Sequence, residues 1–505
     1  MGKKYCEFMD EISADELYRG LLGYGMFANR LPPIFTSEAF YYYCEVAAPA
    51  YINKEWHNYV SFSSMRNVNI PRQFGIPTPM KYQQLCSVLR DNWNAIKTYF
   101  HSQTDNQSYK ISRIHIRKLH GKNEIFEMNY KNWRVDGNPE TDLLLQKHKR
   151  ASKYMVKADI STCFPSIYSH SLSWALVGKD TAKANCKDDT QWYNKIDLAC
   201  STLKNGETHG LLIGPYASNL LAEIILTKVD SRLYDAGYRY SRNIDDYEAY
   251  VDSYEDAQRF LRDLDEALRE FDLPLNHKKT KITSLPVAIA DKWIHKLNSY
   301  LAIVKDTMEY KEVNAYLDLA LSLANDTADS AVLKYAIKAL AAHDMKDSAK
   351  ELAAQRIMHM VVVFPYLVQI VEEFVFQPFG VSNDLIKNFV DALYLDSKET
   401  YNYEGTSYAI YFCLKHDVLL NDLDITWVIE RGDCVMLLMT WLYYLKVNDG
   451  NKSATQLKPL RREANRLKDL DMDRYWLFCY EAVPMGNLKG EWRKLKEAGV
   501  SFITI

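Results

Sequence analysis

The sequence lacks the features that mark three common classes of protein. Its nine cysteines are scattered, with no Cys-x-x-Cys pair, which argues against a zinc ribbon or a disulfide framework. The formal net charge is −3, so no global basic field draws the chain onto nucleic acid. The longest apolar runs, Met360–Val371 and Cys434–Leu445, fall short of the roughly 20 residues that span a bilayer. We interpret both runs as buried helices and expect any nucleic-acid contact to be local.

The chain is long enough for more than one hydrophobic core. It has 505 residues, 48% of them hydrophobic, and domains average roughly 100–200 residues. The N-terminal residues lack the apolar core of a signal peptide. We therefore expect two or three domains in a cytoplasmic protein that does not contact a membrane.

Hydrophobic periodicity predicts an α+β fold followed by an all-α region. Residues 1–100 read as short helices, separated by proline turns near residues 31–33 and 70–79. Residues 101–295 alternate strands and helices. Residues 296–505 show helical periodicity alone, which suits a HEAT-like solenoid, although no consensus repeats at a fixed period.

Positive charge is concentrated between residues 110 and 153. Eleven lysines and arginines stand there against five acids, around a β-hairpin that we expect to turn at Gly121. The stretch predicts a phosphate-facing surface, although a charge run can also be a solvated face. The leading candidates for contacts with a triphosphate are Arg113, Arg117 and Lys118, and the weaker ones are Arg72 and Lys81.

Two acidic segments have the pattern of a two-metal site. Tyr154–Ile160 reads as a strand that ends at Asp159, and Asp245 and Asp246 occupy the expected turn of a second hairpin. Carboxylates from adjacent strands can hold two Mg²⁺ ions, with Mn²⁺ as an alternative, against the attacking hydroxyl and the leaving pyrophosphate. The pattern predicts nucleotidyl transfer.

A second Asp-Asp pair in the chain serves as a comparison. Asp188 and Asp189 lie in a wholly polar setting, which predicts a solvated turn. Asp245 and Asp246 follow Ile244 and precede an aromatic-rich strand, which predicts greater burial.

Two further segments complete the arrangement. Gly214-Pro215 forms a glycine-rich turn before a helix, and such a turn lets a backbone approach a nucleotide closely. After a helix that we expect to be capped by Ser253 and Asp256, Lys279 is placed to protonate the departing pyrophosphate.

In this order the four segments resemble motifs A, B, C and D of reverse transcriptases, over roughly residues 60–290. The closer resemblance is to bacterial abortive-infection polymerases of the AbiK type. That resemblance rests on Tyr168–Trp174, Gly178-Lys179 and Glu207–Gly210, and Leu31–Thr36 resembles the N-terminal segment of related defence reverse transcriptases.

The resemblance implies roles for individual residues. Asp159, Asp245 and Asp246 would be the metal ligands, with the Ile160 carbonyl as a helper. Phe164 would lie beneath the incoming sugar, although it could equally be a core aromatic. The implied nucleotide-binding set is Ile160, Phe164, Gly214, Pro215, Arg113 and Lys118.

The same resemblance implies a phage-defence DNA polymerase that uses deoxynucleoside triphosphates without a template. Its single-stranded DNA product would stay attached to a tyrosine of the protein, and the protein would form a closed homo-oligomer. The run Tyr41–Tyr43 supplies candidate primers, or a packed aromatic patch. Asn243 stands where most reverse transcriptases carry an aromatic residue, which makes ordinary templated extension less expected.

Two other functions stay open on sequence alone. One is a conventional template-directed reverse transcriptase, like those of retrons or group II introns. The other is a helical scaffold that has lost activity, although all three acids remain in this chain.

Overall fold

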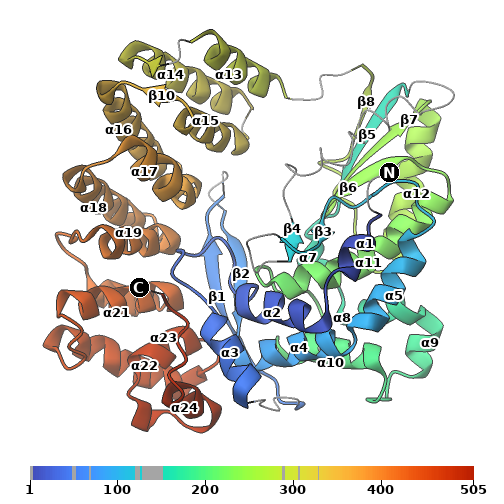
Figure 1. Ribbon diagram of the computed structural model, residues 1–505, viewed down its shortest axis with the longest axis horizontal. Helices are drawn as coiled ribbons and strands as arrows, with labels where there is room; N and C mark the ends of the chain where they lie inside the picture. The colour runs from blue at the N-terminus through green and yellow to red at the C-terminus, as the bar shows by residue number, and fades with distance from the viewer. Residues whose placement is uncertain are drawn as a thin grey trace.

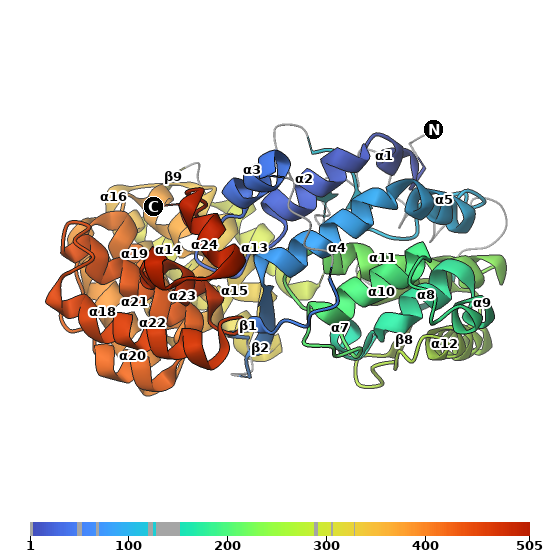
Figure 2. The same ribbon diagram turned by 90° about the horizontal axis from the view of Figure 1, so that it is seen from below.

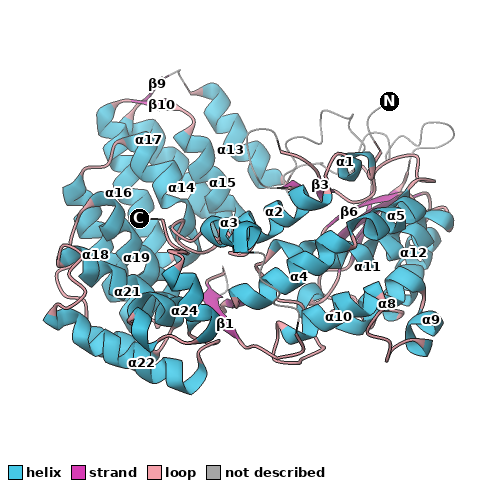
Figure 3. Ribbon diagram, turned by 60° about the horizontal axis from the view of Figure 1, so that its bottom comes forward, coloured by secondary structure: helices cyan, strands magenta, loops and turns pink. Residues whose placement is uncertain are grey.

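A small β-hairpin lies between two groups of elements in the computed structural model (Figure 1). On one side are the main sheet and the N-terminal helices, and on the other is a curved stack of C-terminal helices. Figure 3 shows that helices dominate and that strands gather in the sheet and the hairpin. The α+β prediction with a helical C-terminal region is confirmed. The structure describes residues 4–47, 53–66, 70–119, 125–127, 152–286, 291–304, 307–327 and 329–504.

The N-terminal part contains helices and the hairpin. Its elements are α1 (Glu7–Asp10), α2 (Ala14–Tyr24), α3 (Glu38–Ala47), β1 (Tyr59–Ser64), β2 (Arg72–Pro77), α4 (Pro79–Asp91) and α5 (Trp93–Thr104). The expectation of helices throughout residues 1–100 was wrong for the paired strands β1 and β2. Val60, Phe62 and Ser64 alternate with more exposed neighbours, a period of two that fits a strand and not a helix.

The main sheet has four antiparallel strands in the order β6-β7-β5-β8. They are β5 (Tyr154–Asp159), β6 (Tyr240–Asn243), β7 (Asp246–Val251) and β8 (Lys281–Ser284). The connecting helices are α7 (Cys163–Ser166), α8 (Ser169–Val177), α9 (Lys179–Ala184), α10 (Trp192–Thr202), α11 (Tyr216–Asp235) and α12 (Tyr254–Arg269). Helix α11 packs against α5, α8 and α12, which lie around it in Figure 2.

Helix α12 begins as the sequence predicts. The Ser253 hydroxyl accepts a hydrogen bond from the Asp256 backbone N–H at 3.0 Å, which satisfies a donor at the helix start. Ala257, Phe260 and Leu264 are fully buried on the face that packs on the sheet. The helix therefore covers β5 and β7 and fixes the position of their ends.

The predicted hairpin after residue 109 is present as two short strands. β3 (His115–Ile116) pairs with β4 (Phe126–Glu127) in antiparallel fashion. The expected turn at Gly121 lies outside the described residues, as does most of the basic stretch up to residue 151.

The C-terminal region is helical, as predicted. Its longer helices are α13 (Lys292–Ile303), α14 (Tyr310–Thr327), α15 (Ala331–Ala341), α16 (Asp347–Val363), α18 (Asn383–Glu399), α19 (Tyr403–His416), α21 (Cys434–Val447), α22 (Lys458–Asp471), α23 (Trp476–Ala482) and α24 (Gly490–Glu497). Neighbouring pairs pack in series, including α14 with α16 and α19 with α21. Among the described residues, no helix combines the length and apolarity needed to cross a membrane.

The last residues of the chain pair with the segment that precedes α3. The Thr36 backbone N–H donates to the Phe502 carbonyl at 3.0 Å, and the Thr504 N–H donates to the Ile34 carbonyl at 2.8 Å. Tyr408 of α19 donates to the carbonyls of residues 30 and 31. The helical stack is thus fastened to the N-terminal part at several separate points.

Candidate active site

The three predicted carboxylates meet at one edge of the sheet. Asp159 at the end of β5 is paired in register with Asp246 at the start of β7. Asp245 occupies the turn between β6 and β7, and its carbonyl accepts a hydrogen bond from the Ile160 N–H at 3.1 Å. The turn needs an unusual backbone, because Ile244 has a φ of 57°. The Ile160 carbonyl remains a proposed ligand.

The three carboxylates differ in exposure. Asp159 is buried and Asp245 is partly buried, but Asp246 is exposed, so the expectation of burial was wrong for Asp246. Asp246 is the first residue of β7 and lines a pocket at the edge of the sheet. The comparison pair behaves as expected, since Asp188 bonds to neighbouring Thr190 and exposed Asp189 pairs with Lys54.

Crowding of negative charge changes the ionisation of two of these acids. Desolvation, together with the charges of Asp245 and Asp159, raises the pKa of Asp246 to about 6. Desolvation and the charge of Asp159 also raise the pKa of Asp245, while Lys279 and Arg72 oppose the shift. A divalent cation would relieve this repulsion, and three aspartates offer the oxygen ligands that Mg²⁺ prefers. The donor set therefore fits Mg²⁺.

Lys279 and Asn276 hold the Asp159 carboxylate from the other side. Lys279 Nζ donates to Asp159 Oδ2 at 2.6 Å, and Asn276 Nδ2 donates to Oδ1 at 2.9 Å. The hydrogen bond to Asp159 raises the pKa of Lys279, so the ammonium stays charged. Sequence reasoning named Lys279 but missed Asn276. The sequence signal for Asn276 was its position in the turn after α12, because that turn brings the Asn276 amide beside Asp159 at the end of β5.

A pocket of about 420 Å³ opens beside these groups. Its lining residues are Arg113, Lys157, Ala158, Asp159, Ser241, Asn243, Asp246, Tyr247, Glu248 and Lys279. The structure therefore brings Arg113 to the carboxylates, where its Nη2 donates to Ser241 Oγ at 2.9 Å. It does not bring Lys118 there, because that side chain pairs with Glu16 of α2. Asn243, which replaces the usual aromatic residue, faces the pocket.

The structure also distinguishes between Arg72 and Lys81, the two weaker candidates for contacts with a triphosphate. The charges of Asp245 and Asp159 act on Arg72 in the hairpin, which places that guanidinium near the carboxylates. Lys81 is buried in α4, where its amine contacts Asn53 and Gln84. Arg72 is the better candidate of the two.

In the glycine-rich loop before α11, the backbone itself lies close to the backbone of neighbouring segments. Gly210 has a φ of 85°, and a Cβ there would lie 2.8 Å from the Pro165 carbonyl oxygen. Gly214 has a φ of 130°, and a Cβ there would lie 3.3 Å from the Gly75 oxygen. Pro215 follows as the residue before α11. The loop thus joins the segment after Asp159 to the hairpin, and only glycine fits at both positions.

Phe164 lies in the short helix α7, just after the Asp159 strand. Its carbonyl accepts a hydrogen bond from the Leu211 N–H at 2.8 Å, and its ring is partly buried against the core. This position is compatible with contact to an incoming sugar and with simple packing. The sugar-contact role remains a proposal.

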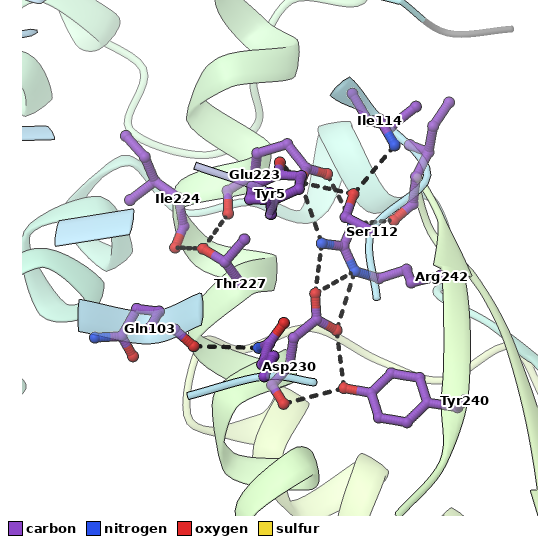
Figure 4. A network of polar contacts seen from close by, with 12 residues as sticks. Tyr5, Gln103, Ser112, Ile114, Glu223, Ile224, Thr227, Asp230, Tyr240 and Arg242 are labelled. Carbon is purple, nitrogen blue, oxygen red and sulfur yellow. Dashed lines mark hydrogen bonds and ion pairs between the residues drawn. The ribbon is translucent and has the colours of Figure 1, made fainter. Parts of the chain in front are cut away.

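Beneath the carboxylates lies a buried charge network that sequence reasoning missed (Figure 4). Arg242 has no exposed surface, and it pairs with Glu223 at 2.7 Å and Asp230 at 2.6 Å. Its Nη1 also donates to the Ile244 carbonyl at 2.9 Å, in the turn that carries Asp245. The available signal was Glu223 and Asp230, two acids seven residues apart that fall on the same face of α11 as its apolar residues.

The network reaches the N-terminus of the chain. Tyr5 and Ser112 donate to Glu223 Oε2 at 2.8 and 2.9 Å, and Tyr240 donates to Asp230 at 3.0 Å. Because every charge in it is hydrogen-bonded, the network can rigidify the strand pair that presents the acids.

Comparison with known proteins agrees with the site. Residues 82–314 match the model of the family described as reverse transcriptase (RNA-dependent DNA polymerase), and this segment holds Asp159, Asp245 and Asp246. A search of curated proteins gave no match.

Telomerases are among the solved structures that this chain resembles. The apo telomerase from Candida tropicalis truncated from its C-terminal domain shares 14% identity over 47% of this chain and 52% of its own, with a TM-score of 0.32. The apo telomerase from Candida tropicalis shares 12% identity over 85% of this chain and 72% of its own, with a TM-score of 0.34. The Candida albicans telomerase in complex with a fragment of telomeric RNA shares 9% identity over 81% of this chain and 64% of its own, with a TM-score of 0.30.

These global similarities are too low to assign a function. The chain spans about half the length of the truncated telomerase. The family match is more specific, because it covers the strands and turns that assemble the carboxylate edge. Residues 82–314 therefore form a domain of the reverse transcriptase type, whose reaction class is nucleotidyl transfer.

Proposed function

We propose that this protein is a phage-defence DNA polymerase of abortive infection, which adds deoxynucleotides without a template to a tyrosine of the protein. The polymerase part of this proposal is supported by one observation. Asp159 and Asp246 are paired in register on adjacent strands, with Asp245 and Lys279 beside them. The defence, template and primer parts are supported by the resemblance to AbiK-type polymerases and by Asn243 in the pocket.

The proposed step is one in-line displacement. A hydroxyl oxygen bonds to the α-phosphorus of a deoxynucleoside triphosphate as the bridging bond to the β-phosphate breaks and pyrophosphate leaves. Bound Mg²⁺ ions would stabilise the charge that develops on the phosphate oxygens. Lys279 stays charged beside Asp159, which supports the proposal that it gives its proton to the departing pyrophosphate. The attacking hydroxyl gives its proton to solvent or to a neighbouring carboxylate.

Among the candidate primers, Tyr42 is the accessible one. Its side chain is 49% exposed, whereas Tyr41 is buried, and Arg19 Nη2 lies 3.5 Å from its hydroxyl. Of the described residues that line the carboxylate pocket, none comes from α3. We therefore propose that Tyr42 reaches the pocket of a neighbouring subunit in a homo-oligomer.

The test is incubation of purified protein with labelled deoxynucleotides and Mg²⁺ in the absence of any template. We expect labelled DNA that stays with the protein after denaturation and is released by protease. Tyr42→Phe should abolish the adduct, while Tyr401→Phe, which removes the hydroxyl of a 57% exposed tyrosine, should not.

Other outcomes identify the alternatives. A protein-free product that forms only with an added primer and template would show a conventional template-directed reverse transcriptase. No incorporation under any condition would favour the inactive scaffold.

A further inference from the structure

Five cations from distant parts of the chain form a series of neighbours that begins near the carboxylate site, where Arg72 interacts with Asp245 and Asp159, and continues onto α15. They are Arg30, Arg66, Arg72, Lys334 and Lys338, and we call them the basic track. Figures 1 and 2 show the elements that carry them, with the hairpin β1–β2 beside α15 of the helical stack. An acidic chain with a net charge of −3 has no general reason to place cations together.

The hairpin end is fixed to the helical stack by a polar junction. Ser64 of β1 pairs in register with Arg72 of β2, and Ser64 Oγ donates to Glu404 Oε1 at 2.9 Å. Gln369 Nε2 donates to the same oxygen at 2.7 Å, and the Arg30 guanidinium binds Gln369 Oε1. This junction brings Arg30 and Arg72 to the same end of the hairpin.

Helix α15 extends the track. Lys334 and Lys338 are one turn apart, so they share a helix face. Lys334 Nζ lies 5.5 Å from the centre of the Tyr366 ring, and Lys338 Nζ lies 4.8 Å from that of Phe374. Tyr366 is buried, but Phe374 is only partly buried, so its ring can also contact a base.

The cations act on one another. Burial and the charges of Arg30 and Lys338 lower the pKa of Lys334 to about 8, while Glu404 opposes the shift. Desolvation and the charges of Arg66 and Arg30 likewise lower the pKa of Arg72. Such mutual repulsion costs free energy, which a polyanion lying along the cations would recover.

The track has a direction. At one end the charges of Asp245 and Asp159 act on Arg72, and at the other end Lys338 is exposed on α15. A chain of phosphates that begins at the carboxylates can therefore continue over the hairpin end to the helical stack. We propose that the basic track binds the single-stranded DNA that leaves the carboxylate site, through its phosphates and without sequence preference.

The proposal rests on the proposed polymerase function, but its test needs neither nucleotide nor Mg²⁺. Binding of a labelled 20-residue oligodeoxythymidylate is measured by fluorescence anisotropy at several salt concentrations. The track variant is Arg66→Glu with Lys338→Glu, because both side chains are exposed and neither lines the pocket. The control, Lys187→Glu with Lys489→Glu, makes the same change in net charge at two other exposed lysines.

Each phosphate contact contributes about 0.7 to the slope of log K against log salt for a single strand. The track variant should therefore lose about 1.4 from this slope and bind about tenfold or more weakly at 0.1 M salt. The control should bind as the wild-type protein does. A circular dichroism melt of both variants excludes unfolding, and Lys338→Gln, with a quarter of the charge change, should give a smaller loss if the track binds DNA.

Unchanged binding by the track variant, an equal loss in the control, or no binding by the wild-type protein would overturn the proposal. Failure of the polymerase proposal looks different, because the protein would then bind the oligonucleotide but incorporate nothing. If the protein is a polymerase, the track variant should still add the first nucleotides and should make shorter products.

Discussion

At the scale of single residues, Asp246 has an unfavourable electrostatic environment. Its pKa of about 6 means that the folded protein binds its proton more tightly than the unfolded chain does. The contribution of this group to stability is therefore present at acid pH and is lost as the pH rises from about 4 through 6. Above pH 6, desolvation of the ionised Asp246 carboxylate and repulsion from Asp245 and Asp159 destabilise the fold.

The first prediction follows from the upward direction of the pKa shift of Asp246. Asp246→Asn should raise the melting temperature at pH 7.5 and should reduce the gain in stability that wild-type protein shows on acidification to pH 5. Mg²⁺ should stabilise the wild-type protein and have little effect on Asp245→Ala with Asp246→Ala, which should also lose all nucleotide incorporation. Differential scanning fluorimetry and a nucleotide-incorporation assay measure these outcomes. Asp188→Asn should not raise stability, because hydrogen bonds lower the pKa of Asp188.

The second prediction concerns Phe164. If its ring lies beneath the incoming sugar, Phe164→Ala should relax discrimination against ribonucleotides by roughly tenfold or more, with deoxynucleotide use retained. The ratio of kcat/KM for the two nucleotide types measures this effect. Phe260→Leu is a control, since it disturbs a fully buried ring of the same domain away from the pocket. An unchanged ratio in Phe164→Ala would leave Phe164 as a packing residue.

At the scale of elements, strand β6 and helix α11 are joined by the buried network of Arg242. Removing one partner of a buried ion pair leaves uncompensated charge, which typically costs about 3–5 kcal/mol. Arg242→Met should lower the free energy of unfolding by about that amount, because Glu223 and Asp230 lose their cation. Arg232→Met is a control on α11, the helix that carries Glu223 and Asp230, because the exposed pairs of Arg232 with Glu266 and Glu270 contribute about 1 kcal/mol or less. Equal losses in urea titrations of both variants would contradict the structural role of the network.

The glycine loop gives a prediction with an internal control. Gly210 and Gly237 have nearly the same φ, 85° and 88°, but a Cβ at Gly237 would meet nothing within 4 Å. Gly237→Ala should cost about 1–2 kcal/mol from the backbone alone. Gly210→Ala should cost more, because its Cβ would collide with the Pro165 carbonyl and displace the loop beside Phe164. Chemical denaturation compares the two losses, and equal losses would show that the loop can move aside.

The sequence predicted the elements whose pattern is local. Asp159 and Asp245 were placed correctly together because each ends or connects a strand with a clear apolar period. The hairpin β1–β2 was missed because its alternation is short and its prolines also mark helix turns. Arg242 was missed because its partners lie in a helix 12 and 19 residues away in the chain, and only the fold brings them together.

At the scale of the whole molecule, the last residues of the chain form part of the N-terminal core. Phe502 has no exposed surface, and its ring lies 5.7 Å from that of Phe40 and 4.9 Å from that of Trp476. Backbone hydrogen bonds at Ile34 and Thr36 hold the same segment. Helices α2 and α3 and the end of the helical stack should therefore be stable only together.

The packing of the last residues into the N-terminal core predicts which segments one substitution should destabilise. Phe502→Ala should lower the free energy of unfolding by about 3–5 kcal/mol, because it leaves a cavity in a buried aromatic cluster. Hydrogen exchange followed by mass spectrometry should show faster exchange both at residues 27–41 and at residues 476–480. Leu470→Ala, at a side chain that is 65% exposed, should change stability by no more than about 0.5 kcal/mol and leave both segments protected. Faster exchange confined to residues 476–504 would instead mean that the end of the chain docks as a separate unit, because residues 27–41 would then keep their protection without it.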